Sequence, residues 1–304
     1  MQKSFKKHNR IRLAIQIAST AIVNGYAAGF MHGKIFTGET KAICVPVLNC
    51  YSCPGALGAC PIGALQAVLG GNKHSVSFYV LGFLMLFGIV LGRLVCGFLC
   101  PFGLVQDLLY KIRTRKFSVP AHIDQMLRPV KYIILIGLVI IAPLIFTNAY
   151  GIAEPYFCKL VCPAGVLQGA LPLMSVNEGL RAAAGFLFSW KFLLLCIVII
   201  ASITISRPFC KYVCPLGAFY GLFNKFSLYQ MSCDASTCIQ CKTCTSVCPM
   251  DIDITKQANG IECIRCGRCK SACPTDSITA GFITPLTPIK PLLKTAEQPS
   301  QKES

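Results

Sequence analysis

Charged side chains are scarce in this sequence of 304 residues, where Asp, Glu, Lys and Arg together make up 13%. A soluble globular chain usually carries about 25% charged residues. Because 54% of the residues are hydrophobic, the chain is too apolar to be disordered. It also has too few polar side chains to cover the surface of a single water-soluble domain.

Recognisable catalytic patterns are absent as well. The four histidines, His8, His32, His74 and His122, are scattered and show no metal-ligand spacing such as H-E-x-x-H. The sequence contains neither a Gly-rich nucleotide fingerprint nor a haem-type C-x-x-C-H motif. We therefore assign no catalytic residue, and we do not expect a stand-alone catalyst of bond-making reactions.

Cysteine and positive charge are abundant instead. The chain has 20 Cys, and its 29 Lys+Arg against 12 Asp+Glu give a formal net charge of +17. Small secreted domains use many cysteines as disulfide staples, but a chain of this length needs none, so its cysteines indicate metal binding. In so apolar a chain the basic excess favours the cytoplasmic face of a membrane, and we expect no nucleic-acid partner.

Four apolar runs approach the length of about 20 residues that a helix needs to span a membrane. They cover residues 13–31, 78–95, 130–149 and 186–205. Lys191 interrupts the fourth run, and its long side chain is expected to reach the near interface. Lys and Arg concentrate before the first run and between the second and third. This distribution predicts a multi-pass protein of the cell (inner) membrane with both termini in the cytoplasm.

The spans fall into two similar halves that are marked by Cys-Pro motifs. A C-x3-C-P motif follows the second run at residues 96–101 and the fourth run at residues 210–215. In the outer loops, C-P-I-G-A-L-Q at residues 60–66 parallels C-P-A-G-V-L-Q at residues 162–168. Two halves that face the same way imply pseudo-twofold symmetry about the membrane normal. We therefore expect a mostly α fold, a four-helix transmembrane bundle made of two tandem two-helix repeats.

This symmetry gathers the cysteines into two sets of four thiolates, the number that a [4Fe–4S] cluster requires. The inner set is Cys96, Cys100, Cys210 and Cys214, and the outer set is Cys53, Cys60, Cys158 and Cys162. On the inner side, unliganded thiols and a zinc ion on four thiolates stay open as alternatives. On the outer side the alternative is disulfide bonds, for example between Cys44 and Cys50. Cys196 is alone in the fourth run and is interpreted as a small buried apolar residue.

From residue 233 the sequence becomes polar and contains two C-x2-C-x2-C-x3-C-P runs, the spacing of bacterial two-cluster ferredoxins. The fourth cysteine of each such run ligates the other cluster. The first cluster would use Cys238, Cys241, Cys244 and Cys273, and the second would use Cys263, Cys266, Cys269 and Cys248. Cys233 belongs to neither run.

These features divide the chain into five parts. They are a first membrane repeat (1–111), a cytoplasmic linker (112–129), a second membrane repeat (130–232), a small α+β ferredoxin domain (233–283) and a tail (284–304). The tail is rich in Pro, Lys, Gln and Ser, and this composition predicts disorder.

The two inner C-x3-C-P motifs and the eight ferredoxin cysteines together resemble the NapH-type membrane ferredoxins, which are related to the NosR and CcoG types. The resemblance implies electron transfer between the membrane, often its quinone pool, and a redox partner protein on the cytoplasmic side. The outer-loop cysteines depart from the NapH pattern. They are Cys44, Cys50, Cys53, Cys60, Cys158 and Cys162, and they favour an electron route across the whole membrane, with a second partner at the outer face.

The sequence thus predicts an electron-transfer protein, or an oxidoreductase subunit, with up to four [4Fe–4S] clusters. Clusters at opposite interfaces would lie about 30 Å apart, too far for one useful hop. Either both outer and inner motifs dip into the hydrocarbon layer, or a quinone or flavin bridges them. Two other classes stay open: a CcoG-like reductase for metal handling or cofactor maturation, and a redox sensor whose outer cysteines form a disulfide.

Overall fold

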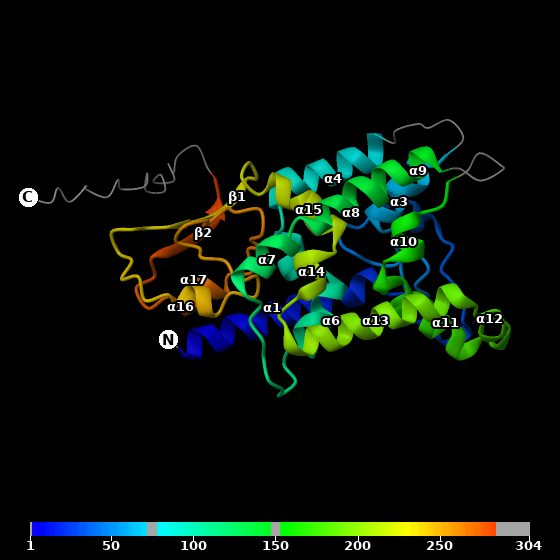
Figure 1. The fold of residues 1–304 in the computed structure, drawn as a ribbon, viewed down its shortest axis with the longest axis horizontal. Helices are drawn as coiled ribbons and strands as arrows, with labels where there is room; N and C mark the ends of the chain where they lie inside the picture. The colour runs from blue at the N-terminus through cyan, green and yellow to red at the C-terminus, as the bar shows by residue number, and fades with distance from the viewer. Residues whose placement is uncertain (1, 72–77, 147–152, 284–304) are drawn as a thin grey trace, which may run out of the picture.

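The computed structural model describes residues 2–71, 78–146 and 153–283. Long helices run along its longest axis, and a small cysteine-rich domain lies at one end of them, next to the N-terminus (Figure 1). The expected disordered tail, His74 and residues 147–149 of the third expected span lie outside the described residues. Both halves of the repeat are therefore largely visible.

The first half contains six helices and a 3-10 turn in the described residues. They are α1 (Gln2–Val23), α2 (Ala27–His32), η1 (Glu39–Ala42), α3 (Pro61–Leu69), α4 (Phe78–Leu91), α5 (Leu94–Phe98) and α6 (Pro101–Leu109). Helix α7 (Ala121–Leu127) lies in the expected linker. The second half contains α8 (Val130–Ile134), the π-helical η2 (Leu135–Ile141), α9 (Ala142–Ile145), α10 (Tyr156–Leu160), the π-helical η3 (Gly165–Ala170), α11 (Leu171–Val176), α12 (Glu178–Ala182), α13 (Phe186–Thr204), α14 (Pro208–Tyr212) and α15 (Pro215–Phe223).

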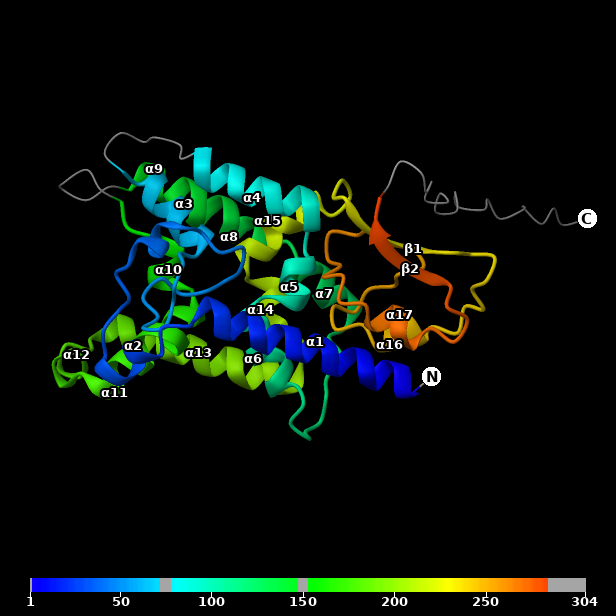
Figure 2. The same ribbon diagram turned by 180° about the vertical axis from the view of Figure 1, so that it is seen from behind.

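The helices surround a core built from the short Cys-Pro segments. Helix α15 packs against α4, α8 and η2, while α6 packs against α1 and α13. Seen from behind, α1 crosses in front of α5 and α6 (Figure 2). The buried core joins apolar side chains such as Leu84 and Phe102 to the cysteines Cys60, Cys96 and Cys214. The cysteines therefore lie in the interior of the bundle.

Two of the four expected spans form helices that are long and apolar enough to cross a membrane, counted among the residues that the structure describes. They are the helical run Ala121–Ile145 and helix α13. The first expected span is broken, because α1 ends at Val23 and the chain turns before α2. The second is short, because α4 ends at Leu91 and Gly92 adopts a left-handed conformation with φ 55°. The four-helix bundle is thus reproduced only in part.

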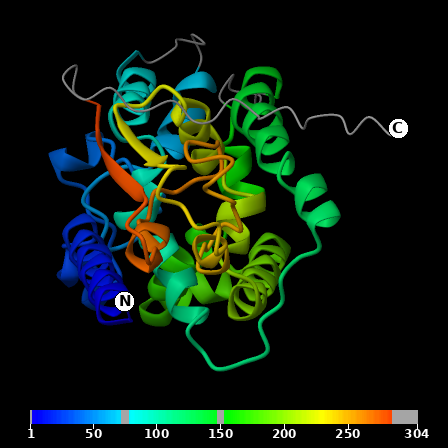
Figure 3. The ribbon, with the colours of Figure 1, turned by 90° about the vertical axis from the view of Figure 1, so that its left-hand side faces the viewer.

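The C-terminal domain has the expected small α+β form. Strand β1 (Tyr229–Cys233) pairs antiparallel with β2 (Ile278–Phe282), with Met231 opposite Ala280. Helices α16 (Thr243–Ser246) and α17 (Arg268–Ala272) complete it. Strand β1, which pairs with β2, thus begins upstream of residue 233, the expected start of the ferredoxin domain. Figure 3 looks along the bundle onto this domain, which covers the ends of the helices.

Buried charges fix the domain onto the bundle. The Glu262 carboxylate accepts hydrogen bonds from Arg93 Nη1 at 3.0 Å and from Lys131 Nζ at 2.5 Å. Arg265 of the C-terminal domain donates a hydrogen bond to the Leu91 carbonyl of the bundle at 3.1 Å. Contact is close enough that a Cβ on Gly97 would lie 2.5 Å from the Ile264 carbonyl oxygen. Glycine at position 97 therefore lets helix α5 touch the domain directly.

Candidate metal sites

The Cys-Pro-x-Gly segments share one local geometry. Cys60, Cys100 and Cys214 are helix N-caps with extended backbone, and the following proline is the first helical residue. In each case the glycine three positions on donates its backbone N–H to the cysteine sulfur, at 3.4 Å for Gly217 and Cys214. Helix N-termini favour negative charge, so these backbones hold sulfurs in a place that suits thiolates.

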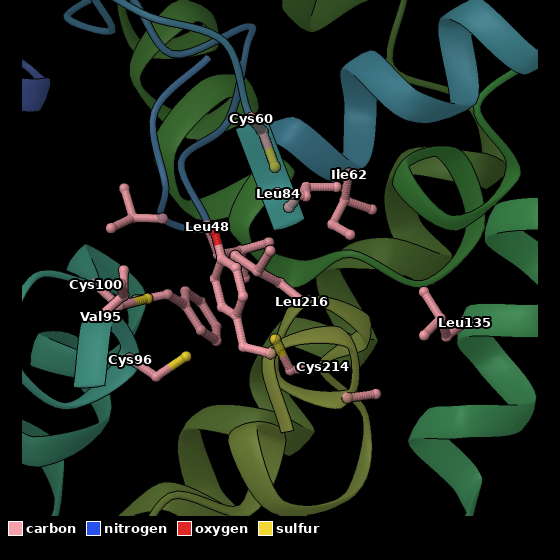
Figure 4. Close-up of a cluster of buried hydrophobic side chains, with 14 of the residues drawn as sticks. Leu48, Cys60, Ile62, Leu84, Val95, Cys96, Cys100, Leu135, Cys214 and Leu216 are labelled. Carbon is pink, nitrogen blue, oxygen red and sulfur yellow. The ribbon is translucent and has the colours of Figure 1, made fainter. Parts of the chain in front are cut away.

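The four inner cysteines line one small cavity between α5, α6, α14 and α15. Figure 4 shows the sulfurs of Cys96, Cys100 and Cys214 around this space. All four side chains are buried. Burial and, to a smaller extent, the neighbouring Cys210 and Cys96 together raise the pKa of the Cys100 thiol to about 12. Four buried, mutually repelling sulfurs are stable as thiolates only around a cationic core, and an iron–sulfur core provides one.

Two arginines cross reciprocally between the halves at the inner motifs. Arg93 and Arg207 each stand three residues before the first cysteine of their motif. Arg93 Nη2 donates to the Cys210 carbonyl at 3.2 Å, and Arg207 Nη1 donates to the Cys96 carbonyl at 2.8 Å. Both guanidinium groups are fully buried. Each arginine thus braces the motif of the other half and adds positive charge near the sulfurs.

Asp107 compensates one of these buried charges. Its carboxylate accepts from Arg207 at 2.6 and 3.0 Å and from Arg12 Nη2 at 2.7 Å. Burial alone would raise the pKa of the Asp107 carboxyl, but the Arg207 and Arg12 guanidinium groups lower it well below its ordinary value. The residue directly before Asp107, Gln106, donates from its Nε2 to Cys210 Sγ at 3.1 Å. Helix α6 therefore supports both the arginine and a sulfur of the inner set.

In the ferredoxin domain, the cysteines of the two runs line two cavities. One cavity is lined by Cys238, Cys241, Cys244 and Cys273. A second is lined by Cys248, Cys263, Cys266 and Cys269, and also by Cys244. Cys233 lies in β1 beside Cys238 and lines the first cavity. Cys233 is therefore part of the first ferredoxin cavity, although it belongs to neither ferredoxin run.

The outer cysteines line a larger cavity of about 870 Å³. Its cysteines are Cys50, Cys60, Cys158 and Cys162. Cys53 is not among its lining residues, and its sulfur lies 3.4 Å from Asn24 Oδ1 instead. Cys44 is buried near Cys60, and all 20 cysteines of the chain are free thiols in the structure. The structure thus unites three of the four cysteines expected here and adds Cys50.

Lys191 differs from the expectation that it reaches the near interface. It lines the outer cavity, and its Nζ donates to the Cys158 carbonyl at 3.0 Å. A charged side chain that points inward from an apolar helix is typical of a functional site. Lys191 points into the cavity and not to the interface because the cavity wall provides its ammonium group with a carbonyl acceptor and several sulfurs.

The outer and inner sets are separated by a single peptide unit. The backbone N–H of Leu48 donates to Cys100 Sγ of the inner set, and that of Asn49 donates to Cys60 Sγ of the outer set. Figure 4 shows Leu48 between Cys60 and the inner cysteines. Since consecutive Cα atoms are about 3.8 Å apart, the two sets lie much closer than opposite membrane interfaces. Both motifs meet inside the bundle.

On its other side the inner set adjoins the ferredoxin domain. A Cβ on Gly97, next to Cys96, would lie 3.5 Å from the Cα of Cys266. The Cys266 carbonyl also lies 2.9 Å from His8 Nε2 of α1. The four sets therefore follow one another, from the outer cavity to the inner cavity and then through the two ferredoxin cavities.

Sequence reasoning missed the residues that position these sulfurs. A signal was present, because Gln recurs at the same place in three copies of the motif, as Gln66, Gln106 and Gln168, and Arg recurs as Arg93 and Arg207. Polar residues repeated in an otherwise apolar stretch mark buried hydrogen-bonding positions.

Within residues 2–71, 78–146 and 153–283, no three His, Cys, Asp or Glu side chains are grouped to hold a single metal ion.

Known proteins share these motifs. A sequence family described as "4Fe-4S binding domain" matches residues 74–120, 132–180 and 186–228, and a second family of the same description matches residues 262–279. The ferredoxin-type protein MauN for methylamine utilization, from Paracoccus denitrificans, is 28% identical over 79% of this chain and 75% of its own length. The putative electron transport protein YccM of Escherichia coli is 29% identical over 61% of this chain and 49% of its own.

An uncharacterized protein of Methanocaldococcus jannaschii is 31% identical over 56% of this chain, and the match spans 63% of that relative's length. No solved structure matches the chain.

Proposed function

Because 4Fe-4S binding domain families match this chain and the ferredoxin-type protein MauN is similar to it, we propose that it is a NapH-type membrane ferredoxin that carries electrons between the cell membrane and a redox partner in the cytoplasm. The observation that carries the proposal is the succession of cysteine-lined cavities, in which neighbouring sets touch through Leu48–Asn49 and through Gly97. A [4Fe–4S] cluster supplies reversible one-electron transfer where four thiolates hold it.

The chain's own residues do three things at these sites. Cys96, Cys100 and their partners from α14 and α15 offer four sulfurs to one cavity. Backbone amides at helix N-termini hydrogen-bond the sulfurs of Cys100 and Cys214, and hydrogen bonds to sulfur tune the reduction potential. The surrounding core excludes water, since the four side chains are at most 8% exposed.

The exposed faces of the helices support insertion into a membrane. In helix α13 only 11% of the most apolar 18-residue window is buried, and in Ala121–Ile145 only 28%, whereas a core helix of a soluble protein would be mostly buried. Helix α1 likewise exposes apolar side chains and buries polar ones, because Arg12 and Gln16 are buried while Ile15 and Ile22 are exposed. Large contiguous apolar surface of this kind suits lipid.

The proposed orientation places the ferredoxin domain and both termini in the cytoplasm, as the distribution of Lys and Arg favours. The soluble redox partner would dock beside the first ferredoxin cavity, where Cys241 is exposed and the exposed Lys242 and Lys256 line the rim. The membrane partner is a quinone. Its isoprenoid body would occupy the apolar rim of the outer cavity, formed by Leu173, Met174, Leu180, Leu187 and Phe188.

Reoxidation by a long-chain quinone in vesicles tests this function. The reduced ferredoxin chromophore of the wild-type protein should be reoxidised by the quinone, and replacing Cys96 and Cys210 together by Ala should abolish that reaction. The variant should retain about 8 iron ions per chain in the two ferredoxin clusters, which shows that it is folded. Cys196→Ala, in α13 and outside all four sets, is the matched control. Equal reoxidation by the double variant would refute the proposed route.

A further inference from the structure

We propose that the outer cavity is an additional [4Fe–4S] site whose ligands are Cys50, Cys60, Cys158 and Cys162, with the Asn49 side chain as a hydrogen-bond donor to the cluster. The inference rests on the proposed electron-transfer function and extends it to the outer side of the bundle. The residues that the two sequence families match in this chain include neither Cys50 nor Cys60. The assignment replaces Cys53, which sequence spacing favours, by Cys50.

Two glutamines give Cys50 the same place in the first half that Cys158 has in the second. Gln66 and Gln168 stand at equivalent positions of the repeated motif. Gln66 Oε1 accepts from the Phe157 backbone N–H at 2.9 Å, and its Nε2 donates to Cys158 Sγ at 3.4 Å. Gln168 Oε1 crosses in the opposite direction and accepts from the Cys50 backbone N–H at 2.9 Å. Each glutamine therefore holds the cysteine segment of the other half.

The glycines of the two motifs show the same reciprocity. A Cβ on Gly63 would have Cys158 Sγ as its nearest neighbour at 3.8 Å, and a Cβ on Gly165 would lie 3.9 Å from Cys50 Sγ. The helix that begins after Cys60 thus faces Cys158 of the second half, and the helix that begins after Cys162 faces Cys50 of the first half. Cys50 and Cys158 are pseudo-symmetry mates, as Cys60 and Cys162 are, and the four together make the two-plus-two arrangement of the inner set.

Asn49 indicates that a polar group belongs in this cavity. Its side chain is fully buried and lines the cavity, yet within the described part of the chain neither its Oδ1 nor its Nδ2 has a hydrogen-bond partner. A buried amide without partners costs about 1–3 kcal/mol. The sulfide or thiolate sulfur of a cluster is an acceptor that would satisfy its N–H donors.

Charge at the cavity also suits a cluster. An oxidised [4Fe–4S] core of about +2 with four thiolates has a net charge of about −2. Two lysines approach Cys50, namely Lys191 from α13 and Lys41 from η1. Lys41 is itself buried, and its Nζ donates to the Ala56 carbonyl at 2.8 Å. Two ammonium groups beside four sulfurs balance the charge that the proposed site would carry.

Iron and acid-labile sulfide, measured on anaerobically purified protein with Cys50→Ser or Cys53→Ser, test the assignment. Cys50→Ser should lower the content by about 4 iron ions per chain and remove one electron paramagnetic resonance signal. Cys53→Ser, three residues away and equally conservative, should leave both unchanged. Loss on Cys53→Ser alone would overturn Cys50 as the ligand, and full retention by both variants would overturn the outer site. Neither result would affect reoxidation through the inner set, which tests the proposed function separately.

Asn49→Leu gives a second readout that does not depend on iron loss. The variant should keep its iron, while the midpoint potential of the outer signal should fall because a hydrogen bond to the cluster is removed. An unchanged potential would show that Asn49 does not face the cluster.

Discussion

Replacing Asp107 by Leu is expected to destabilise the protein by about 3–5 kcal/mol, the cost of leaving a buried partner charge uncompensated. The carboxylate accepts three hydrogen bonds from Arg12 and Arg207, and all three side chains are at most 6% exposed. In Asp107→Leu both guanidinium groups stay buried without their anion. The apparent melting temperature in detergent should fall by roughly 10 °C, and iron of the inner set should be lost first because Arg207 braces Cys96.

The matched control for this variant is Glu178→Gln. Glu178 also pairs with an arginine, Arg181, but its side chain is 92% exposed. Exposed ion pairs contribute little, so the melting temperature should stay unchanged. A similar loss in both variants would show that burial of the charge at Asp107 is not the cause.

The same ion pairs predict the pH dependence. Because the pKa of Asp107 in the folded protein lies below its ordinary value, its stabilising effect is fully present above the unfolded value of about 3.9 and is lost only as the pH falls towards the folded value. The melting temperature difference between wild type and Asp107→Leu should therefore be constant from neutral pH down to about pH 5.

Replacing Glu262 by Leu is expected to detach the ferredoxin domain from the bundle. Glu262 lies between Arg93 and Lys131, which are both fully buried. Without the carboxylate, two cations remain at a closed interface at a cost of about 3–5 kcal/mol, and separation of the two parts returns them to water. Hydrogen–deuterium exchange should rise at residues 91–97 and 261–266, while the two ferredoxin clusters remain, since all eight of their cysteines are untouched.

Asp276→Asn controls for the loss of an acidic residue in the same domain. Asp276 is exposed and adopts a left-handed backbone with φ 51°, a conformation that Asn tolerates well. Exchange at the interface should not change. If Glu262→Leu leaves the interface equally protected, the buried ion cluster is not what docks the domain.

The sequence predicted the ferredoxin and inner cysteine sets because their spacing is local or repeated. In C-x2-C-x2-C-x3-C the sulfurs follow from a few consecutive backbone angles, and in C-x3-C-P the proline fixes the helix start after the second cysteine. The antiparallel pairing of β1 and β2, and the arginines that cross between halves, needed the tertiary structure. Repeats alone do not say which carbonyl a buried guanidinium reaches.

The outer cysteines were harder to place for a physical reason. Cys44, Cys50 and Cys53 lie in an irregular segment between η1 and α3, where no helical or strand period fixes the direction of a side chain. Cys50 turns into the cavity because Gln168 holds its backbone, and Cys53 turns towards Asn24. The closeness of the outer and inner sets was one of two alternatives that the sequence left open, because it depends on the course of Leu48 and Asn49 between two helix N-termini.

The central claim is that four cysteine sets form one continuous series of [4Fe–4S] sites. Iron and acid-labile sulfide in the anaerobically purified wild-type protein test it most directly. Four sites of four irons predict about 16 iron ions and as many sulfides per chain. About 8 of each would mean that the ferredoxin domain alone holds clusters, and it would contradict the claim for both sets inside the bundle.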